Sequence, residues 1–379
     1  MFIDNKIQVK LIQKTLKQNK TVAITVTGNS MLPLIEPHQK VTITPTKFSN
    51  IKLYDIVAIK HDQSIIIHQC IFKSKKYLIT HGINNNFIDP PTKPNQILGT
   101  IIQTKIYLIN NMFHANQLNQ LSKLTSYKIP FLLLKGASWQ KNFFGYYLNR
   151  PTADIDISVK KEDYPLIKKT LLKQKYRIKT IPWLNQKRYQ QKIPTVSEIS
   201  FFKNHKNFKL EFDIHLHTIR CALNPFFTHP ISRQDMVKLD KYFWKTAKQI
   251  KKNIFVLEKE NLLFYFCMNS VFHHALHGLK PLVYIASLID KKIINWDNFW
   301  HLAKKYQVNH YIYYPLVYTK LFFKVKIPKL DQHRPNLIQR ILIKPIINRK
   351  SIFTSLRGEV RYQEWLVTKS VTWLRLILL

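Results

Sequence analysis

Short runs of β-branched and other apolar residues, separated by turn residues, fill roughly the first 110 positions of the chain. Asn84 to Asn86 and the Pro90–Pro91 pair mark loops between such runs. We expect these positions to form an all-β domain, bounded at residues 1–112. The runs predict strands at 22–26, 41–44, 55–60, 64–72, 77–80 and 97–108.

Apolar positions take a helical spacing over 113–127, and from Asp163 onward helix and strand patterns alternate. Apolar runs predict strands at 131–135 and 209–217. From Glu258 to the end, helical spacing dominates and prolines punctuate it. We therefore expect an α+β fold, in which a domain of alternating helices and strands over 113–230 precedes a helical extension over 231–379.

The chain is strongly basic: 60 Lys and Arg against 21 Asp and Glu give its 379 residues a formal net charge of +39. Such a charge attracts phosphate backbones non-specifically. However, abundant Lys, Ile and Asn with only 7 Gly are typical of AT-rich coding sequence. We therefore expect no dedicated nucleic-acid partner, but a general attraction for anionic ligands or membrane surfaces.

Several features bear on where the protein is found. Its 3 Cys fit a reducing compartment. Neither a secretory signal nor an uncharged apolar run long enough to span a bilayer occurs. We expect a cytoplasmic protein. The tail at 365–379 is either a docked terminal helix or a basic amphipathic helix with peripheral contact at a membrane surface.

A serine, a histidine and an aspartate stand where nucleophilic catalysis would need them. Ser30 follows a predicted strand, on a turn between Gly28 and Pro33. Serine becomes a good nucleophile only when a base takes its proton, and a third group should orient that base. His68, at the end of an apolar run, is the candidate base, and Asp89 is available to orient it.

The order of five motifs resembles the signal peptidase clan, which includes membrane signal peptidases and LexA-like self-cleaving repressors. These motifs are Gly-x-Ser-Met-x-Pro, Asp-Ile-Val, a strand ending in His, Thr-x-Gly-x-Asn-Asn and Ile-Leu-Gly. The resemblance implies that Ser30 is the nucleophile, His68 the general base and Asp89 the orienting carboxylate. With a His at the base position, the chain is similar to the branch of the clan that uses Ser, His and Asp.

Some positions depart from that pattern. Tyr54 stands where Gly is usual, Ile83 where Asp is usual, and Gln69 where Arg commonly follows the His. The clan's membrane anchor, an Ala-Gly cleavage site and a helix-turn-helix before Ser30 are all missing. We therefore expect neither the membrane role nor the repressor role. A β fold that only binds peptide is the alternative to a peptidase.

Two acidic patterns predict a metal and phosphate site. Asp154 and Asp156 share one face of a strand, about 6–7 Å apart at their Cα atoms, and two such carboxylates repel unless a cation lies between them. Mg²⁺ favours this sparse oxygen ligation. In the second pattern, one face of the strand predicted at 209–217 carries Glu211, Asp213, His215 and His217. A solvent-exposed edge strand is the alternative explanation for this pattern.

Leu-Leu-Lys-Gly at 133–136, an Arg before Asp-Ile-Asp, and a later Asp-x-His resemble the uncharacterised nucleotidyltransferase family of the DNA polymerase β-like superfamily. The resemblance covers roughly residues 115–300 and implies a mixed sheet and Mg²⁺-dependent transfer from a nucleoside triphosphate. It implies that Asp154 and Asp156 bind Mg²⁺, and that Asp213 binds the metal that activates the acceptor hydroxyl. Phosphate contacts are expected from Lys135, Gly136 and Arg150.

Histidines near this site have more than one interpretation. His215 has either a supporting role beside the metal ligands or a structural one. His273, His274 and His277 could form a two-His zinc face, but core or acceptor-pocket histidines fit better because no acidic ligand shares their turn.

We therefore expect a Mg²⁺-dependent nucleotidyltransferase fused to a signal-peptidase-like Ser/His peptidase domain. Its acceptor would be a peptide or protein, in peptide natural-product maturation. The alternative is a serine peptidase that processes a small precursor and whose nucleotidyltransferase-like domain only binds. A non-enzymatic scaffold at a membrane surface or on nucleic acid rests on charge and the tail alone.

Overall fold

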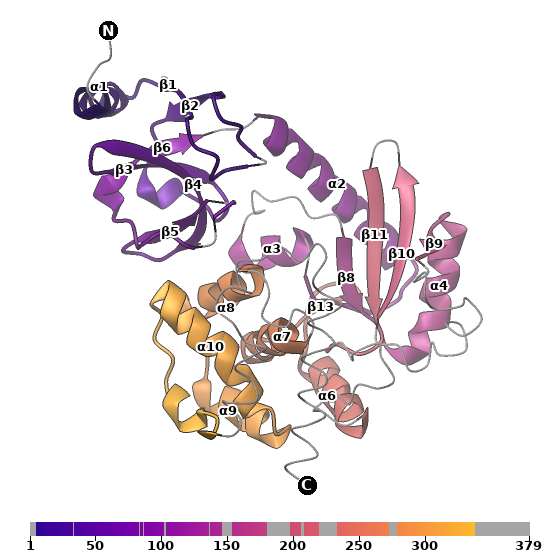
Figure 1. Ribbon diagram of the computed structural model, residues 1–379. Helices are drawn as coiled ribbons and strands as arrows, with labels where there is room; N and C mark the ends of the chain where they lie inside the picture. Colours follow the sequence, from indigo (N-terminus) through magenta and orange to yellow (C-terminus); the bar gives the residue numbers. More distant parts are fainter. Residues whose placement is uncertain are drawn as a thin grey trace. The chain divides into compact units, whose positions relative to one another are not determined.

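The computed structural model describes residues 5–32, 34–82, 84–85, 87–101, 104–135, 137–145, 154–179, 198–205, 208–219, 233–272 and 279–337. The chain divides into two compact units, one formed mainly by Met1–Asn111 and the other by most residues from Met112 onward. Both contain a β-sheet, and helices predominate in the second (Figure 1). The α+β fold expected from the sequence is confirmed.

The first unit is an antiparallel sheet with one helix before it. Its six strands are arranged in the order β1-β2-β6-β3-β4-β5. Buried Ile43, Ile56, Ala58 and Ile67 form its core together with Met31 from the loop after β1. The elements are α1 (Asn5–Lys17), β1 (Val22–Thr25), β2 (Lys40–Thr44), η1 (Phe48–Asn50), β3 (Ile56–His61), β4 (Ser64–Lys73), β5 (Leu78–His81), η2 (Pro94–Gln96) and β6 (Ile97–Ile101).

Strands β1 to β5 lie within one residue of their predicted bounds. The prediction of a strand over 97–108 was wrong beyond Ile101, because helix α2 begins at Thr104. Helix α1 was missed. Its only buried side chains in the described part are Val9, Ile12 and Leu16, and the lysines between them obscured that short helical period.

The second unit is built on a mixed sheet of seven strands in the order β12-β13-β7-β8-β11-β10-β9. Strand β8 pairs in parallel with β11, and β7 pairs in parallel with β13. The elements up to β11 are α2 (Thr104–Ser126), β7 (Phe131–Leu133), α3 (Ala137–Phe144), β8 (Asp154–Ser158), η3 (Lys161–Asp163), α4 (Tyr164–Lys173), β9 (Arg177–Ile178), β10 (Glu198–His205) and β11 (Phe208–His215).

The chain after β11 is mainly helical but returns once to the sheet. Strands β12 and β13 form a hairpin at the sheet edge, although they follow the boundary expected at residue 230. That boundary stays a prediction. These later elements are α6 (Arg233–Thr246), β12 (Lys248–Lys251), β13 (Ile254–Val256), α7 (Lys259–Phe272), α8 (Lys280–Asp290), α9 (Trp296–Lys305), α10 (Asn309–Phe323) and η5 (Leu330–His333).

The sheet of the second unit has one apolar and one polar face. Because alternate residues of a strand point to opposite faces, Ile155 and Ile157 enter the core while their aspartate neighbours face the other way. Helices α2 and α4 cover the apolar face, and Leu124 and Ile167 pack into the same core. Within the described residues, no helix has both the length and the apolar character needed to cross a membrane.

Gly99 of β6 lies so close to β2 that a side chain would not fit. A Cβ atom at this position would stand 2.2 Å from the carbonyl oxygen of Thr44. The Gly99→Ala variant should therefore lose about 1–3 kcal/mol of unfolding free energy, because the clash is with backbone and not with a movable side chain. Urea unfolding of the full chain, followed by fluorescence and circular dichroism, measures this loss.

Gly28→Ala is the matched control, because a Cβ at Gly28 meets no atom within 4 Å among the described residues. It should leave the unfolding midpoint close to that of the parent chain. Equal midpoints for Gly99→Ala and Gly28→Ala would contradict the close approach of β6 and β2.

Candidate active sites

The loop after β1 presents Ser30 on a short turn anchored in the core of the first unit. The backbone N–H of Leu34 donates to the carbonyl of Met31 at 2.8 Å, and that of Ile35 donates to the same carbonyl at 3.1 Å. The side chains of Met31 and Ile35 are almost fully buried. The buried residues of this turn thus anchor the backbone that directly follows Ser30.

Ser30, His68 and Asp89 form a continuous hydrogen-bonded chain. The Nε2 atom of His68 lies 2.9 Å from the Oγ of Ser30, and its Nδ1 lies 2.6 Å from Oδ2 of Asp89. His68 belongs to β4, whereas Asp89 follows β5 and is also held by the hydroxyl of Thr80 at 2.5 Å. The structure therefore brings together three residues that are up to 59 positions apart in the sequence.

The carboxylate of Asp89 determines which ring nitrogen of neutral His68 carries the proton. An ionised carboxylate only accepts hydrogen bonds, so the 2.6 Å contact places a proton on Nδ1 of His68. In the neutral ring the lone pair is then on Nε2, directed at the Ser30 hydroxyl. This is the arrangement in which a histidine can take a proton from a serine.

A loop after β5 closes the other side of the histidine. The backbone N–H of Asn84 donates to the carbonyl of Ser30 at 2.8 Å, and the Asn84 side chain donates to the carbonyl of Asn29 at 3.3 Å. A Cβ at Gly82 would stand 2.8 Å from Nε2 of His68. The glycine of the Thr-x-Gly-x-Asn-Asn motif is thus needed for a close approach to the imidazole.

Two of the departures from the clan's pattern have a structural role. Tyr54 has a φ of 68°, in the left-handed region that favours glycine, which explains why Gly is usual there. Gln69 donates from Nε2 to the Tyr54 carbonyl at 3.1 Å and so steadies this turn. The third departure, Ile83, lies outside the described residues, as does Pro33.

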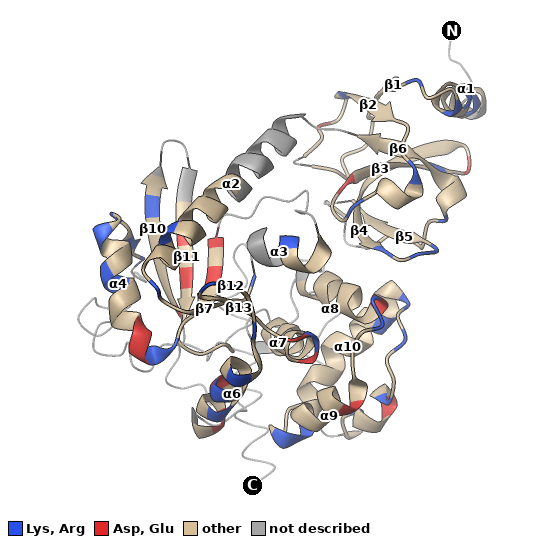
Figure 2. Cartoon of the chain, turned by 180° about the vertical axis from the view of Figure 1, so that it is seen from behind, with Lys and Arg blue, Asp and Glu red and all other residues tan. Residues whose placement is uncertain are grey.

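The second candidate site is on the polar face of the mixed sheet. In the parallel pairing of β8 and β11, Asp213 is the partner of Asp156, and Glu211 is the partner of Asp154. Figure 2 shows the acidic residues of these two strands side by side. Strand β11 lies between β8 and β10, so the edge-strand explanation of its acidic face is wrong.

Asp156 is held by two basic side chains. The Nζ of Lys135 lies 2.8 Å from Oδ1 of Asp156, and the Nε2 of His215 lies 3.1 Å from the same oxygen. Burial alone would raise the pKa of Asp156, but the charge of Lys135 and the hydrogen bond from His215 bring it below its ordinary value. Burial would likewise lower the pKa of Lys135, yet Asp156 raises it above normal.

The pKa of Asp213 is shifted in the opposite direction to that of Asp156. Its burial, together with the nearby carboxylates of Asp156 and Glu198, raises its pKa to about 7. Its Oδ1 atom is buried and has no hydrogen-bond partner among the described residues. A positive charge at this oxygen would relieve both the repulsion and the lost hydration.

The donor set on this face fits a hard divalent cation such as Mg²⁺. Asp154, Asp156 and Asp213 offer only oxygen atoms, and the buried Oδ1 of Asp213 lacks a partner in the described structure. As placed here, no three His, Cys, Asp or Glu side chains among the described residues lie so that they could hold a metal ion, so the side chains would have to move to bind one. Lys135 and His215 both bind the Asp156 oxygen that a cation would use.

Sequence reasoning missed several residues of this site. Glu198 and Ser200 lie on β10 opposite His215 and Asp213. Tyr265 of α7 interacts electrostatically with Lys135 and Asp156, and its buried hydroxyl has no hydrogen-bond partner in the described part of the chain. No local motif marks these residues, because only the antiparallel register and the packing of α7 bring them here.

Other predicted residues serve different purposes or cannot be placed. Glu211 is bound by Lys179 at 2.7 Å, and His217 by Asp240 of α6, away from Asp156. The predictions that fall outside the described residues are those for Gly136, Arg150, His273, His274 and His277 and for the tail at 365–379.

Comparison with known protein families supports both parts of the chain. A model described as Peptidase S24-like matches residues 2–102, and one described as Uncharacterised nucleotidyltransferase matches residues 102–324. No curated protein and no solved structure matches the chain. The second match covers more than half of the sequence, so this chain belongs to the uncharacterised nucleotidyltransferase family and carries a peptidase S24-like domain before it.

Proposed function

We propose that the second unit is a Mg²⁺-dependent nucleotidyltransferase. The observation that supports this most strongly is the β8–β11 register, which pairs Asp213 with Asp156 on the face that also carries Asp154. In the reaction, an acceptor hydroxyl attacks the α-phosphorus of a nucleoside triphosphate, the bond to the bridging oxygen breaks, and pyrophosphate leaves. Asp154, Asp156 and Asp213 would hold Mg²⁺, which when bound supplies positive charge against the triphosphate.

The protein's own side chains then have distinct tasks. Asp213 has a pKa of about 7 while no cation is bound, and a cation at its oxygen would keep it ionised. It would then hold the metal that activates the acceptor hydroxyl, and the proton of that hydroxyl would leave to water. Lys135 would neutralise phosphate charge as it exchanges Asp156 for the substrate. His215 would keep Asp156 oriented through its hydrogen bond to Oδ1.

The same proposal gives the first unit a peptidase activity. Ser30 would attack a peptide carbonyl while His68 takes its proton at Nε2, and the imidazolium, stabilised by Asp89, would return that proton to the leaving amine. Water would then release the acyl group from Ser30. A chain with both activities would act on a peptide or protein, and maturation of a peptide natural product is the process that would use both.

The second candidate function is a serine peptidase whose nucleotidyltransferase-like unit only binds. One observation favours it: Lys135 and His215 already satisfy Oδ1 of Asp156. If the lysine does not release that oxygen, a phosphate-bearing ligand could bind without reacting. Nucleotide transfer that depends on the aspartates separates the two functions.

Replacing Asp156 by Asn should lower nucleotidyl transfer by more than about a hundredfold, because it removes a negative oxygen donor needed by the cation. Asp154→Asn should act in the same direction. Transfer of radiolabel from an α-labelled nucleoside triphosphate to candidate peptides measures this, and excess EDTA should abolish it in the parent chain. Asp62→Asn is the control, since that side chain is 90% exposed and belongs to the first unit.

Label transfer that is equal in Asp154→Asn, Asp156→Asn and the control would contradict the metal-site assignment. Retention of transfer in EDTA would contradict the dependence on a divalent cation.

Asp213→Asn should stabilise the cation-free protein while removing its transfer activity. The pKa of Asp213 is higher in the folded chain, at about 7, than the ordinary value of 3.8. The folded state therefore binds its proton more tightly and loses stability as pH rises between these values. The melting temperature of Asp213→Asn should exceed that of the parent at about pH 8, and the gap should narrow near pH 5.

Thermal unfolding in EDTA at both pH values, with Asp62→Asn as the exposed control, measures this gap. A gap of the same size at both pH values would show that the charge of Asp213 is not what destabilises the fold.

Ser30→Ala should reduce peptide cleavage by at least about a thousandfold, because no other group supplies the attacking oxygen. The assay is mass spectrometry of a peptide library incubated with the full chain. Ser64→Ala is the matched control, because Ser64 is an exposed serine of β4 whose hydroxyl donates to the nearby His61 carbonyl. Cleavage should persist in EDTA, and equal cleavage by Ser30→Ala and Ser64→Ala would exclude the peptidase mechanism.

A further inference from the structure

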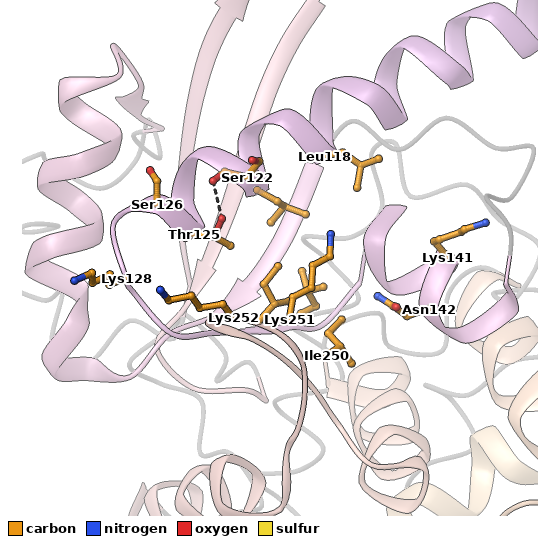
Figure 3. A pocket seen from close by; sticks show the side chains of 13 residues that line it. Leu118, Ser122, Thr125, Ser126, Lys128, Lys141, Asn142, Ile250, Lys251 and Lys252 are labelled. Carbon is orange, nitrogen blue, oxygen red and sulfur yellow. Dashed lines mark hydrogen bonds between the residues drawn. The ribbon is translucent and has the colours of Figure 1, made fainter.

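A pocket of about 920 Å³ lies in the second unit between α2, α3 and the β12–β13 hairpin (Figure 3). It is not part of the carboxylate site. Leu133 of β7, which lines it, pairs with Ile157 of β8 and so shares the apolar face of the sheet, opposite the face of Asp156. Its volume is in the range of pockets that enclose small ligands.

The inner wall of the pocket is apolar. Leu121, Leu133 and Ile254 are buried there and belong to the core under the sheet. Leu118 stands one helical turn before Leu121 on α2, and it is 38% exposed although it is a large aliphatic side chain. An aliphatic surface left open at the entrance of a pocket favours a ligand with an apolar body.

The rim of the pocket is cationic. Lys128, Lys141, Lys251 and Lys252 stand around it, and no Asp or Glu is among the described residues that line it. Lys141 also donates to the Gly145 carbonyl at 2.8 Å. Because the described lining carries lysines but no carboxylate, it favours a ligand with an anionic group.

Hydroxyl groups at the rim are already committed to the helix. Thr125 donates from its hydroxyl to the Ser122 carbonyl at 2.6 Å, and Ser126 donates to the Lys123 carbonyl at 2.7 Å. Their hydrogens are therefore not available to a ligand anion. The lysines are the charged side chains of the described lining, so they would recognise an anion.

The hairpin that carries two of the lysines is fixed to the end of α2. Asn253, with a φ of 63°, lies in the turn beside Lys252, and its side chain donates to the Thr125 carbonyl at 3.4 Å. Its own carbonyl accepts from the Phe131 N–H at 2.9 Å. These contacts fix the turn that follows Lys251 and Lys252 to the end of α2 and the start of β7.

We propose that this pocket binds a single-chain anionic amphiphile, an aliphatic chain that ends in a phosphate or a carboxylate. The chain lies against Leu118, Leu121 and Ile254, and its charged end lies among Lys128, Lys251 and Lys252. Such a ligand can be free in solution or belong to a membrane. The proposal does not depend on the nucleotidyltransferase activity, because it concerns the opposite face of the sheet.

Calorimetric titration of the full chain with dodecyl phosphate, below its micelle concentration, tests the proposal. One equivalent should bind, at least about tenfold tighter than inorganic phosphate, because only the amphiphile uses the apolar wall. Lys251→Gln/Lys252→Gln should weaken binding about tenfold or more. Leu118→Ser should weaken dodecyl phosphate but leave inorganic phosphate unchanged.

Lys169→Gln/Lys173→Gln on α4 is the matched control, since it removes the same charge from exposed positions of the unit that do not line the pocket. Equal weakening by this control would overturn the proposal, as it would show attraction to net charge alone. No binding, or binding no tighter than that of inorganic phosphate, would overturn it as well.

Vesicles of phosphatidylglycerol distinguish the two sources of the ligand. Sedimentation with these vesicles that is lost in Lys251→Gln/Lys252→Gln supports a membrane lipid as the ligand. Binding of free dodecyl phosphate without such sedimentation supports a soluble one.

Discussion

The parallel pairing of β8 with β11 is the constraint on which the larger unit depends. A strand turns alternate side chains to opposite faces, so one register sets two surfaces at once. With Ile157 opposite Ile214, the apolar residues meet α2 and α4, and with Asp156 opposite Asp213, the carboxylates meet on the other face. A shift by one residue would bury the acids in the core and expose the isoleucines, so the fold and the site require the same alignment.

That alignment concentrates negative charge in a buried place, and the chain compensates for only part of it. Lys135 neutralises Asp156 and His215 contacts the same oxygen, whereas Asp213 keeps a raised pKa and a buried oxygen that has no partner in the described structure. Buried ionisable groups that lower the stability of the folded state in this way are common at functional sites. The first unit shows the opposite balance: each polar atom of Ser30, His68 and Asp89 that chemistry needs is held by another member of the chain or by Thr80.

Sequence patterns predicted the strands of the first unit and the position of its Ser, His and Asp, because period-two alternation and ordered motifs are local signals. Helix α1 was not predicted, because three buried residues among lysines give a weak helical period. Glu198 and Tyr265 were missed for a different reason. Their places at the carboxylate site depend on the β10–β11 hairpin and on the packing of α7, which no local pattern encodes. Residues that a motif marks could be anticipated even where they lie far apart in the sequence, whereas Glu198 and Tyr265, which no motif marks, could not.

We propose that Asp154, Asp156 and Asp213 together hold a divalent cation against a triphosphate. A crystal structure of the full chain with Mn²⁺ and a non-hydrolysable nucleoside triphosphate would test this proposal, because anomalous scattering locates the Mn²⁺. We expect Mn²⁺ bonded to oxygens of Asp156 and Asp213, with Lys135 turned from Asp156 to the phosphates. Nucleotide bound with Mn²⁺ elsewhere, and the Lys135–Asp156 ion pair intact, would contradict it.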